Sequence, residues 1–126
     1  MFEISVKTHF SAAHRLVGYD GACANPHGHN WEVTIFIRGR ALDDIGILVD
    51  FREIKAALQD ILGSLDHCDL NALPAFATQN PTSENLAQLL YRGLAERLNN
   101  ARYRIQRVDV AESPGTSAGY WEDGNS

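Results

Sequence analysis

Residues 2–14, FEISVKTHFSAAH, and residues 27–38, HGHNWEVTIFIR, decide the fold of this chain. In the first stretch the even positions are mostly apolar, and His14 keeps their parity. In the second stretch the odd positions after His29 are apolar, and both His27 and His29 share that parity. Alternation with a period of two is typical of half-buried strands. The sequence therefore predicts two strands whose apolar faces both end in histidine.

The segment between these strands, residues 18–26, is rich in Gly, Asp, Asn and Pro and carries Cys23. Such a composition predicts a long loop that closes an antiparallel hairpin.

Two helices are predicted after the hairpin. Asp50 and Glu53 resemble a capping box, and apolar residues then recur at helical spacing, which predicts a helix that ends near Asp66. A second helix, capped by Thr82 or Ser83, carries one stripe of leucines: Leu86, Leu90, Leu94 and Leu98.

The C-terminal part of the chain is predicted to form two more strands. Alternation from Tyr103 to Val110 slips near Gln106 and Arg107, as a bulge would produce, and Glu112 follows on the inward face. Residues 116–121 are expected to pair back as a fourth strand. The order strand, strand, helix, helix, strand, strand predicts a single α+β domain over residues 1–126, with a four-stranded antiparallel sheet and two helices on one face.

The apolar strand positions also bear on assembly. Two helices are not expected to cover all the odd residues from Trp31 to Ile37 and all the even residues from Phe2 to Phe10. This argument favours a homo-oligomer.

Bulk properties exclude several classes of protein. The chain has 126 residues, a net charge of -5 and 44% hydrophobic residues, which is globular and offers no general attraction for nucleic acid. No run approaches the roughly 20 apolar residues of a membrane span. The N-terminus lacks the pattern of a secretory signal, so a cytoplasmic protein with two reduced cysteines is expected.

Three histidines form the candidate metal site. His27 and His29 project to the same side of one strand, and His14 can supply a third nitrogen from the neighbouring strand. Three nitrogen ligands leave a fourth position open, as in catalytic zinc sites. Copper, nickel and iron are alternatives for nitrogen ligands, and each histidine taken alone could be an ordinary residue at a strand end.

The other candidate site residues each allow two interpretations. Cys23 could close the site as a fourth ligand and make the zinc structural, or act as a thiolate base. Asp66 and His67 could be a proton-transfer pair or a loop dipeptide. Glu112 could bind adjacent N–H groups of a ligand or pair with an arginine.

Five segments together resemble the 6-pyruvoyl-tetrahydropterin synthase superfamily. They are Phe10–Leu16 (FSAAHRL), Cys23–Asn30 (CANPHGHN), Leu65–His67 (LDH), Asn80–Glu84 (NPTSE) and Glu112. Three residues separate Cys23 from His27, which is the spacing of the branch that makes 6-carboxy-5,6,7,8-tetrahydropterin in queuosine (7-deazapurine) biosynthesis. The pyruvoyl branch usually has five.

The resemblance implies a tunnelling fold, in which copies assemble into a barrel as trimers or hexamers with sites between subunits. It implies a lyase that converts 7,8-dihydroneopterin triphosphate to 6-carboxy-5,6,7,8-tetrahydropterin, acetaldehyde and triphosphate, with one Zn²⁺ per subunit. By the same resemblance His14, His27 and His29 are the zinc ligands, Cys23 is the proton acceptor, Asp66 and His67 are its relay, and Glu112 anchors the pterin.

Some alternatives stay open after the resemblance. They are a pyruvoyl-forming synthase, a non-catalytic structural-zinc or pterin-binding module, and a zinc hydrolase. The cations that bind the triphosphate are not identified by sequence; Arg15, Lys55 and a neighbouring subunit are candidates.

Overall fold

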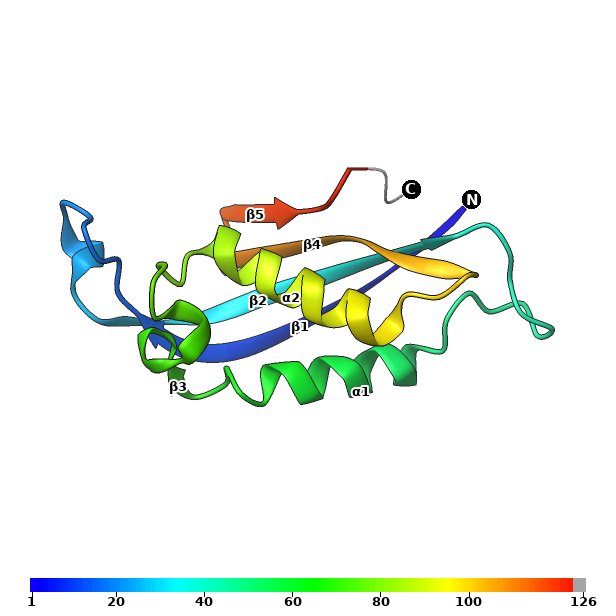
Figure 1. The fold of residues 1–126 in the computed structure, drawn as a ribbon, viewed down its shortest axis with the longest axis horizontal. Coiled ribbons are helices and arrows are strands. Elements are labelled where there is room, and N and C mark those ends of the chain that lie inside the picture. The colour runs from blue at the N-terminus through cyan, green and yellow to red at the C-terminus, as the bar shows by residue number, and fades with distance from the viewer. Residues whose placement is uncertain (124–126) are drawn as a thin grey trace.

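The computed structural model describes residues 1–123. The elements follow one another as β1 (Phe2–His14), a 3-10 turn (Ala22–Ala24), β2 (His27–Gly39), α1 (Phe51–Leu62), β3 (Cys68–Asp69), 3-10 turns at Leu70–Ala72 and Pro74–Phe76, α2 (Ser83–Leu98), β4 (Tyr103–Ser113) and β5 (Thr116–Tyr120). The α+β class and the order of the four predicted strands and two helices are confirmed (Figure 1).

The strands form one mixed sheet in the order β3-β1-β2-β4-β5. β1, β2, β4 and β5 are antiparallel to their neighbours, whereas β3 pairs in parallel with Ala12 and Ala13 of β1. The expected sheet of four antiparallel strands is therefore one strand short. A strand of two residues is too short to show a period of two, so the sequence pattern could not reveal it.

Both helices begin at the predicted caps. The Asp50 side chain accepts the N–H of Arg52, and the Thr82 hydroxyl accepts the N–H of Asn85. α1 ends at Leu62, however, and not near Asp66. Leu65 is 2% exposed although it lies in the turn after the helix. Its burial continues the helical spacing of apolar residues beyond Leu62, which is why the sequence predicted too long a helix.

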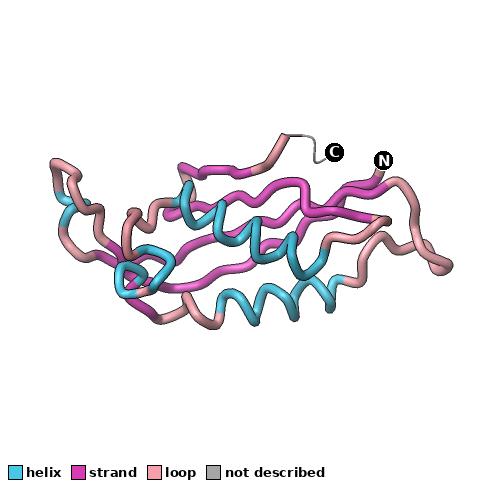
Figure 2. The backbone as a smooth tube through the Cα atoms, in the orientation of Figure 1, coloured by secondary structure: helices cyan, strands magenta, loops and turns pink. Residues whose placement is uncertain are grey.

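The two helices lie on one face of the sheet, α2 against β4 and β5 and α1 beside α2 (Figures 1 and 2). Beneath them the apolar residues of β2, from Trp31 to Ile37, are at most 1% exposed, and Val6 and Phe10 of β1 are also buried. For β2 the argument that two helices cannot cover these residues is therefore wrong. For β1 the helices leave part of the series uncovered, because Phe2 is 45% exposed and Ile4 and Thr8 are only partly buried.

The opposite face of the sheet is polar. Its ion pairs join Lys7 to Glu32, Arg38 to Glu3, and Arg107 to Asp109. One covered face and one polar face are usual for an antiparallel sheet.

The predicted bulge is confirmed in β4. Arg107 pairs with Phe36 and Ile105 with Ile37, which leaves Gln106 as the extra residue. After the bulge Val108, Val110 and Glu112 alternate on the helix-covered side of the strand. The bulge thus sets which way Glu112 faces.

Candidate metal centre

Strand register brings the three histidines together. His14 lies directly opposite His27 across the β1–β2 pair, and His29 lies opposite Ala12, one step along the same face. The ring centroids are 4.5 Å apart for His14 and His27, 5.1 Å for His14 and His29, and 4.8 Å for His27 and His29. The predicted convergence of the three imidazoles is confirmed.

Glu112 reaches the same point from β4. Its Oε2 lies 3.0 Å from His29 Nε2 and 3.8 Å from His14 Nε2. One candidate ligand atom from each of these four residues lies within 4.8 Å of the others. The cluster contains the donor types that bind zinc and related transition metals.

Backbone carbonyls fix which nitrogen of two rings faces the cluster. His14 Nδ1 lies 2.8 Å from the Pro81 carbonyl oxygen, and His27 Nδ1 lies 2.8 Å from that of Asn25. Because a carbonyl oxygen only accepts, both Nδ1 atoms must carry the hydrogen. The Nε2 atoms of the neutral rings are then lone-pair donors, as in metal sites whose ligands are oriented by hydrogen bonds to the backbone.

Two of the Nε2 atoms make no hydrogen bond within the described part of the chain, although the Glu112 carboxylate lies beside both. His14 Nε2 and His29 Nε2 are buried and accept no hydrogen bond among the described residues. Orphaned buried polar atoms are rare and call for an explanation such as an ion. A cation between the three rings and Glu112 would satisfy both atoms, so the residues fit a metal ion.

Burial lowers the pKa of His14 below its ordinary value of 6.5; the Pro81 hydrogen bond opposes this shift and the nearby His27 reinforces it. A lowered pKa keeps the ring neutral, which is the form that binds metal.

For the metal-free protein we expect the free energy of unfolding to fall as the pH drops below about 6.5. Below this pH the unfolded chain binds a proton at His14 that the folded protein still excludes, so protonation favours unfolding. Urea unfolding between pH 7.5 and 5.5 measures the slope. The His14→Asn variant, which keeps an N–H donor, should show a smaller slope, and an unchanged slope would contradict this assignment.

The contacts of Glu112 differ from those expected of a residue that only anchors a pterin. Besides its proximity to the imidazoles, its Oε1 lies 3.5 Å from the hydroxyl of Ser83, the first residue of α2. In this geometry Glu112 can contact a metal ion directly. Its role as a pterin anchor stays a prediction.

Cys23 lies apart from this cluster. It sits in the 3-10 turn of the hairpin loop, which extends beyond the end of the sheet (Figure 2). Its carbonyl oxygen accepts the N–H of Leu16. The fourth member of the cluster is Glu112 and not Cys23, so the proposed Cys23–histidine tetrad does not form in this structure.

Asp66 and His67 form a pair in the turn after α1. Asp66 Oδ1 accepts the N–H of Ser11, and Asp66 Oδ2 lies 3.0 Å from His67 Nδ1. The hydrogen bond from Ser11 is the main reason that the pKa of Asp66 is lowered, with His67 adding to the effect. The His67 side chain is 81% exposed and its φ is 57°, so a strained backbone presents an oriented imidazole to the outside.

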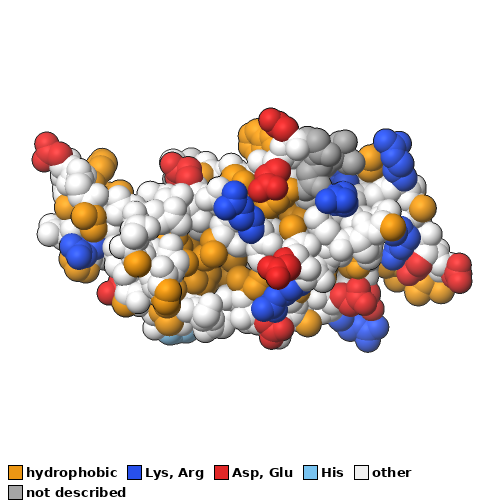
Figure 3. All heavy atoms as spheres, viewed as in Figure 1, with side chains coloured by type: hydrophobic (Ala, Val, Ile, Leu, Met, Phe, Trp, Pro, Cys, Tyr) orange, Lys and Arg blue, Asp and Glu red, His pale blue; other side chains and the backbone are white. Residues whose placement is uncertain are grey.

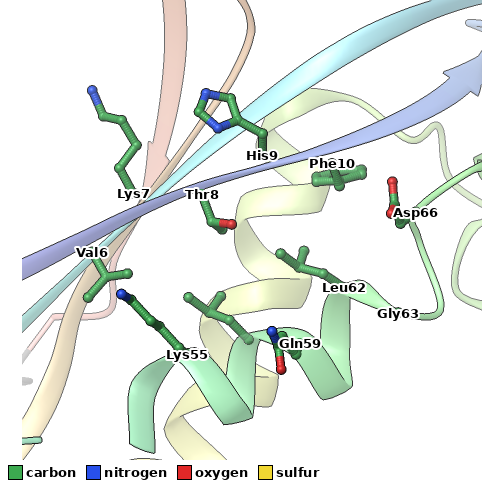
Figure 4. Close-up of a pocket in the computed structure, with 11 residues that line it drawn as sticks. Val6, Lys7, Thr8, His9, Phe10, Lys55, Gln59, Leu62, Gly63 and Asp66 are labelled. Carbon is green, nitrogen blue, oxygen red and sulfur yellow. The ribbon is translucent and has the colours of Figure 1, made fainter. Parts of the chain in front are cut away.

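A groove of about 370 Å³ runs from this pair along α1 and the edge of β1. Figure 4 shows Lys55 and Gln59 on α1 below β1 and Asp66 at the far end, while Lys7 and His9 project from the other side of the strand. Lys55, a candidate cation for the triphosphate, therefore lies in the same groove as Asp66.

Two asparagines hold the start of the loop that carries Cys23: Asn71, which the sequence did not point to, and Asn80, which it pointed to only as part of the NPTSE segment. The Asn71 amide accepts the N–H of Arg15 and donates to its carbonyl oxygen. The Asn80 amide makes the same two bonds with Val17. Each amide thus makes the pair of backbone hydrogen bonds that a neighbouring strand would make. The N–H of Leu16, which lies between Arg15 and Val17, donates to the Cys23 carbonyl oxygen.

The Asn80→Ala variant is expected to lose about 1–2 kcal/mol of stability and to be cleaved faster by protease within residues 15–26, because two hydrogen bonds to Val17 disappear. Limited proteolysis and urea unfolding measure both effects. The control is Gln79→Ala, which removes an amide that donates to the Ala75 carbonyl oxygen. Equal cleavage of the two variants would refute the role of Asn80.

Taken together, a helix-covered sheet and three imidazoles converging with a carboxylate at the end of a hairpin define an α+β protein with a group of side chains that could hold a metal ion. Residues 3–123 match the family model of 6-pyruvoyl tetrahydropterin synthase. The chain belongs to this family.

Similar proteins carry names from two branches. The chain is 35% identical over 121 residues to 6-carboxy-5,6,7,8-tetrahydropterin synthase of Bacillus subtilis, with 90% of this chain and 80% of that protein covered. It is 30% identical over 113 residues to 6-pyruvoyl tetrahydrobiopterin synthase of Dictyostelium discoideum, with 80% and 84% covered. The solved structure of Caenorhabditis elegans 6-pyruvoyl tetrahydropterin synthase superposes with a TM-score of 0.86 at 27% identity, covering 97% of this chain and 96% of that one.

No helix within residues 1–123 is long and apolar enough to cross a membrane.

Proposed function

We propose that the protein is a zinc-dependent lyase that converts 7,8-dihydroneopterin triphosphate to 6-carboxy-5,6,7,8-tetrahydropterin, acetaldehyde and triphosphate in queuosine biosynthesis. The observation that carries the proposal is the cluster of His14, His27 and His29 with two orphaned Nε2 atoms. The Bacillus subtilis relative, named for this product, supports it. We expect one Zn²⁺ per subunit and a cytoplasmic enzyme.

The three histidines would hold the zinc through Nε2, and Glu112 lies close enough to contact it or a bound substrate. Neutral imidazoles are suited to Zn²⁺, and three of them leave room for substrate oxygens. When bound, zinc supplies Lewis-acid polarisation, which acidifies the C–H beside a coordinated hydroxyl.

The protein's own residues would move the protons. Cys23, as a thiolate, would accept the proton from the substrate side chain. Asp66 holds the Nδ1 side of His67, so Nε2 is the atom of His67 that would give or take a proton. The Glu112 carboxylate would accept hydrogen bonds from the paired N–H groups of the pterin. This would place the side chain of the substrate at the metal.

The arrangement of these groups supports a site shared between subunits. His67 is exposed and lies outside the metal cluster, as Cys23 does. The sheet also has two free edges, because β3 covers only Ala12 and Ala13 of β1, and β5 is the last strand. We propose a homo-oligomer, a trimer or a hexamer, joined through these edges, in which His67 of one copy serves the metal of another.

Mixed oligomers test this sharing. The Cys23→Ala and His67→Ala variants should each have strongly reduced activity alone. Co-expressing them should restore part of the activity, because some sites then combine an intact Cys23 with an intact His67. Activity of the purified mixed oligomer is the measurement. No recovery in oligomers shown to contain both variants would place both residues in one chain's site.

The product assay tests the function itself. Zinc-loaded protein incubated with 7,8-dihydroneopterin triphosphate should release acetaldehyde and the 6-carboxy pterin, identified by mass spectrometry. The pyruvoyl pterin as sole product would favour the sibling synthase, whose name the Dictyostelium discoideum relative carries. Binding without turnover would favour a non-catalytic pterin-binding module, and cleavage of simple esters or amides without lyase activity would favour a hydrolase.

A further inference from the structure

A second pocket lies at the end of the sheet remote from the metal centre. It has a volume of about 370 Å³ and is lined where β2 leaves the sheet and β4 enters it. Figure 3 shows several Lys and Arg side chains at this end of the molecule, with Asp and Glu side chains among them, and Figure 1 places the N-terminus there. Its charged lining residues are Arg38, Arg40, Arg102 and Arg104.

The charge of this arginine pocket is unusual for the chain. Four of the 11 lysines and arginines line it, and its lining includes no aspartate or glutamate, although the net charge of the protein is -5. Arg38 and Arg104 are direct cross-strand partners. Of these two, Arg38 forms an ion pair with Glu3, whose Oε2 lies 2.6 Å from Arg38 Nε.

Arg102 is held in place without losing its charge. Its Nη1 donates to the carbonyl oxygens of Ala41 and Ile47, and its guanidinium lies 5.2 Å from the centre of the Tyr103 ring. Neutral acceptors and an aromatic face orient the group but do not neutralise it. In the same loop, Asp43 Oδ1 accepts the N–H groups of Ile45 and Ile47.

We propose that the arginine pocket binds a polyphosphate group, either free or carried by a nucleotide. Guanidinium forks match phosphate oxygens in pairs, and a pocket of this volume is of the size that holds small ligands. This inference goes beyond the proposed lyase reaction. Arg38 lies nine residues along β2 from His29, about 30 Å at the usual rise of a strand, so one substrate molecule cannot occupy both places in one chain.

The test is isothermal titration of the zinc-loaded protein with inorganic triphosphate, ATP and GTP at 0.15 M salt. Arg40→Ala and Arg102→Gln should each weaken binding about tenfold or more. Arg102→Gln keeps an N–H donor for the two carbonyls, so the loop they belong to stays anchored. Arg97→Ala, which removes an arginine paired with Asp60, should bind as the wild type does.

Because triphosphate also binds zinc, the titration is repeated on His27→Ala, whose arginine pocket is intact and which should bind equally well. Tighter binding of ATP or GTP than of triphosphate would identify a nucleotide as the ligand, and equal binding would identify the phosphates alone. The proposal is overturned if the wild type does not bind, if Arg97→Ala weakens binding as much as the pocket variants do, or if only His27→Ala abolishes it. None of these outcomes depends on whether the lyase reaction occurs.

Discussion

Replacing Cys23 by Ala is expected to lower kcat for the lyase reaction by about a hundredfold to ten-thousandfold, the range in which general acid–base groups contribute. The zinc content should stay that of the wild type, because Cys23 lies outside the cluster formed by the three histidines and Glu112. Steady-state kinetics and metal analysis of the same preparation measure both quantities. Together, the kinetics and the zinc content show whether Cys23 is a catalytic base or a zinc ligand.

Cys68→Ala is the matched control for this substitution. Cys68 is also a free thiol of intermediate exposure, but its Sγ donates to the Asp66 carbonyl oxygen, 3.3 Å away. Its removal should leave kcat within a few fold of wild type. Loss of zinc and of folding in Cys23→Ala would instead show that Cys23 holds a structural metal.

Replacing His27 by Ala is expected to weaken zinc binding by more than roughly 10–100-fold, which is the cost of losing a residue that only hydrogen-bonds to a metal ligand. Zinc at a thousand times its dissociation constant should stabilise the wild type by about 4 kcal/mol over the metal-free protein. In His27→Ala most of this gain should vanish at the same zinc concentration. Thermal or urea unfolding with and without zinc measures the difference.

His9→Ala controls for the loss of an imidazole from the same sheet. His9 lies on the polar face and pairs with Glu32 at 3.3 Å, away from the cluster. It should keep the full stabilisation by zinc. If His27→Ala kept it as well, His27 would not be a ligand.

Much of the metal centre could be predicted from parity alone. In paired antiparallel strands, side chains of matching parity share a face, so His14, His27 and His29 had to meet once the hairpin closed in register. The same rule placed Glu112 on the covered face, and the slip at Gln106 revealed the bulge. Periodicity is informative where every second residue meets the same environment.

Other features depend on contacts that no local pattern records. The carbonyls of Pro81 and Asn25 orient two of the rings, and Asn71 and Asn80 bind the loop through side chains distant in sequence. The coverage of the β2 residues also could not be predicted from the number of helices, because it depends on how closely α2 packs over β4 and β5 and against α1.

The most direct test of the metal centre is zinc K-edge X-ray absorption of the protein loaded with one equivalent of Zn²⁺. We expect three imidazole nitrogens and one or two oxygens at about 2.0–2.2 Å, with no sulfur, which corresponds to His14, His27 and His29 with an open or Glu112-filled position. A sulfur shell at about 2.3 Å, or fewer than three imidazoles, would contradict this.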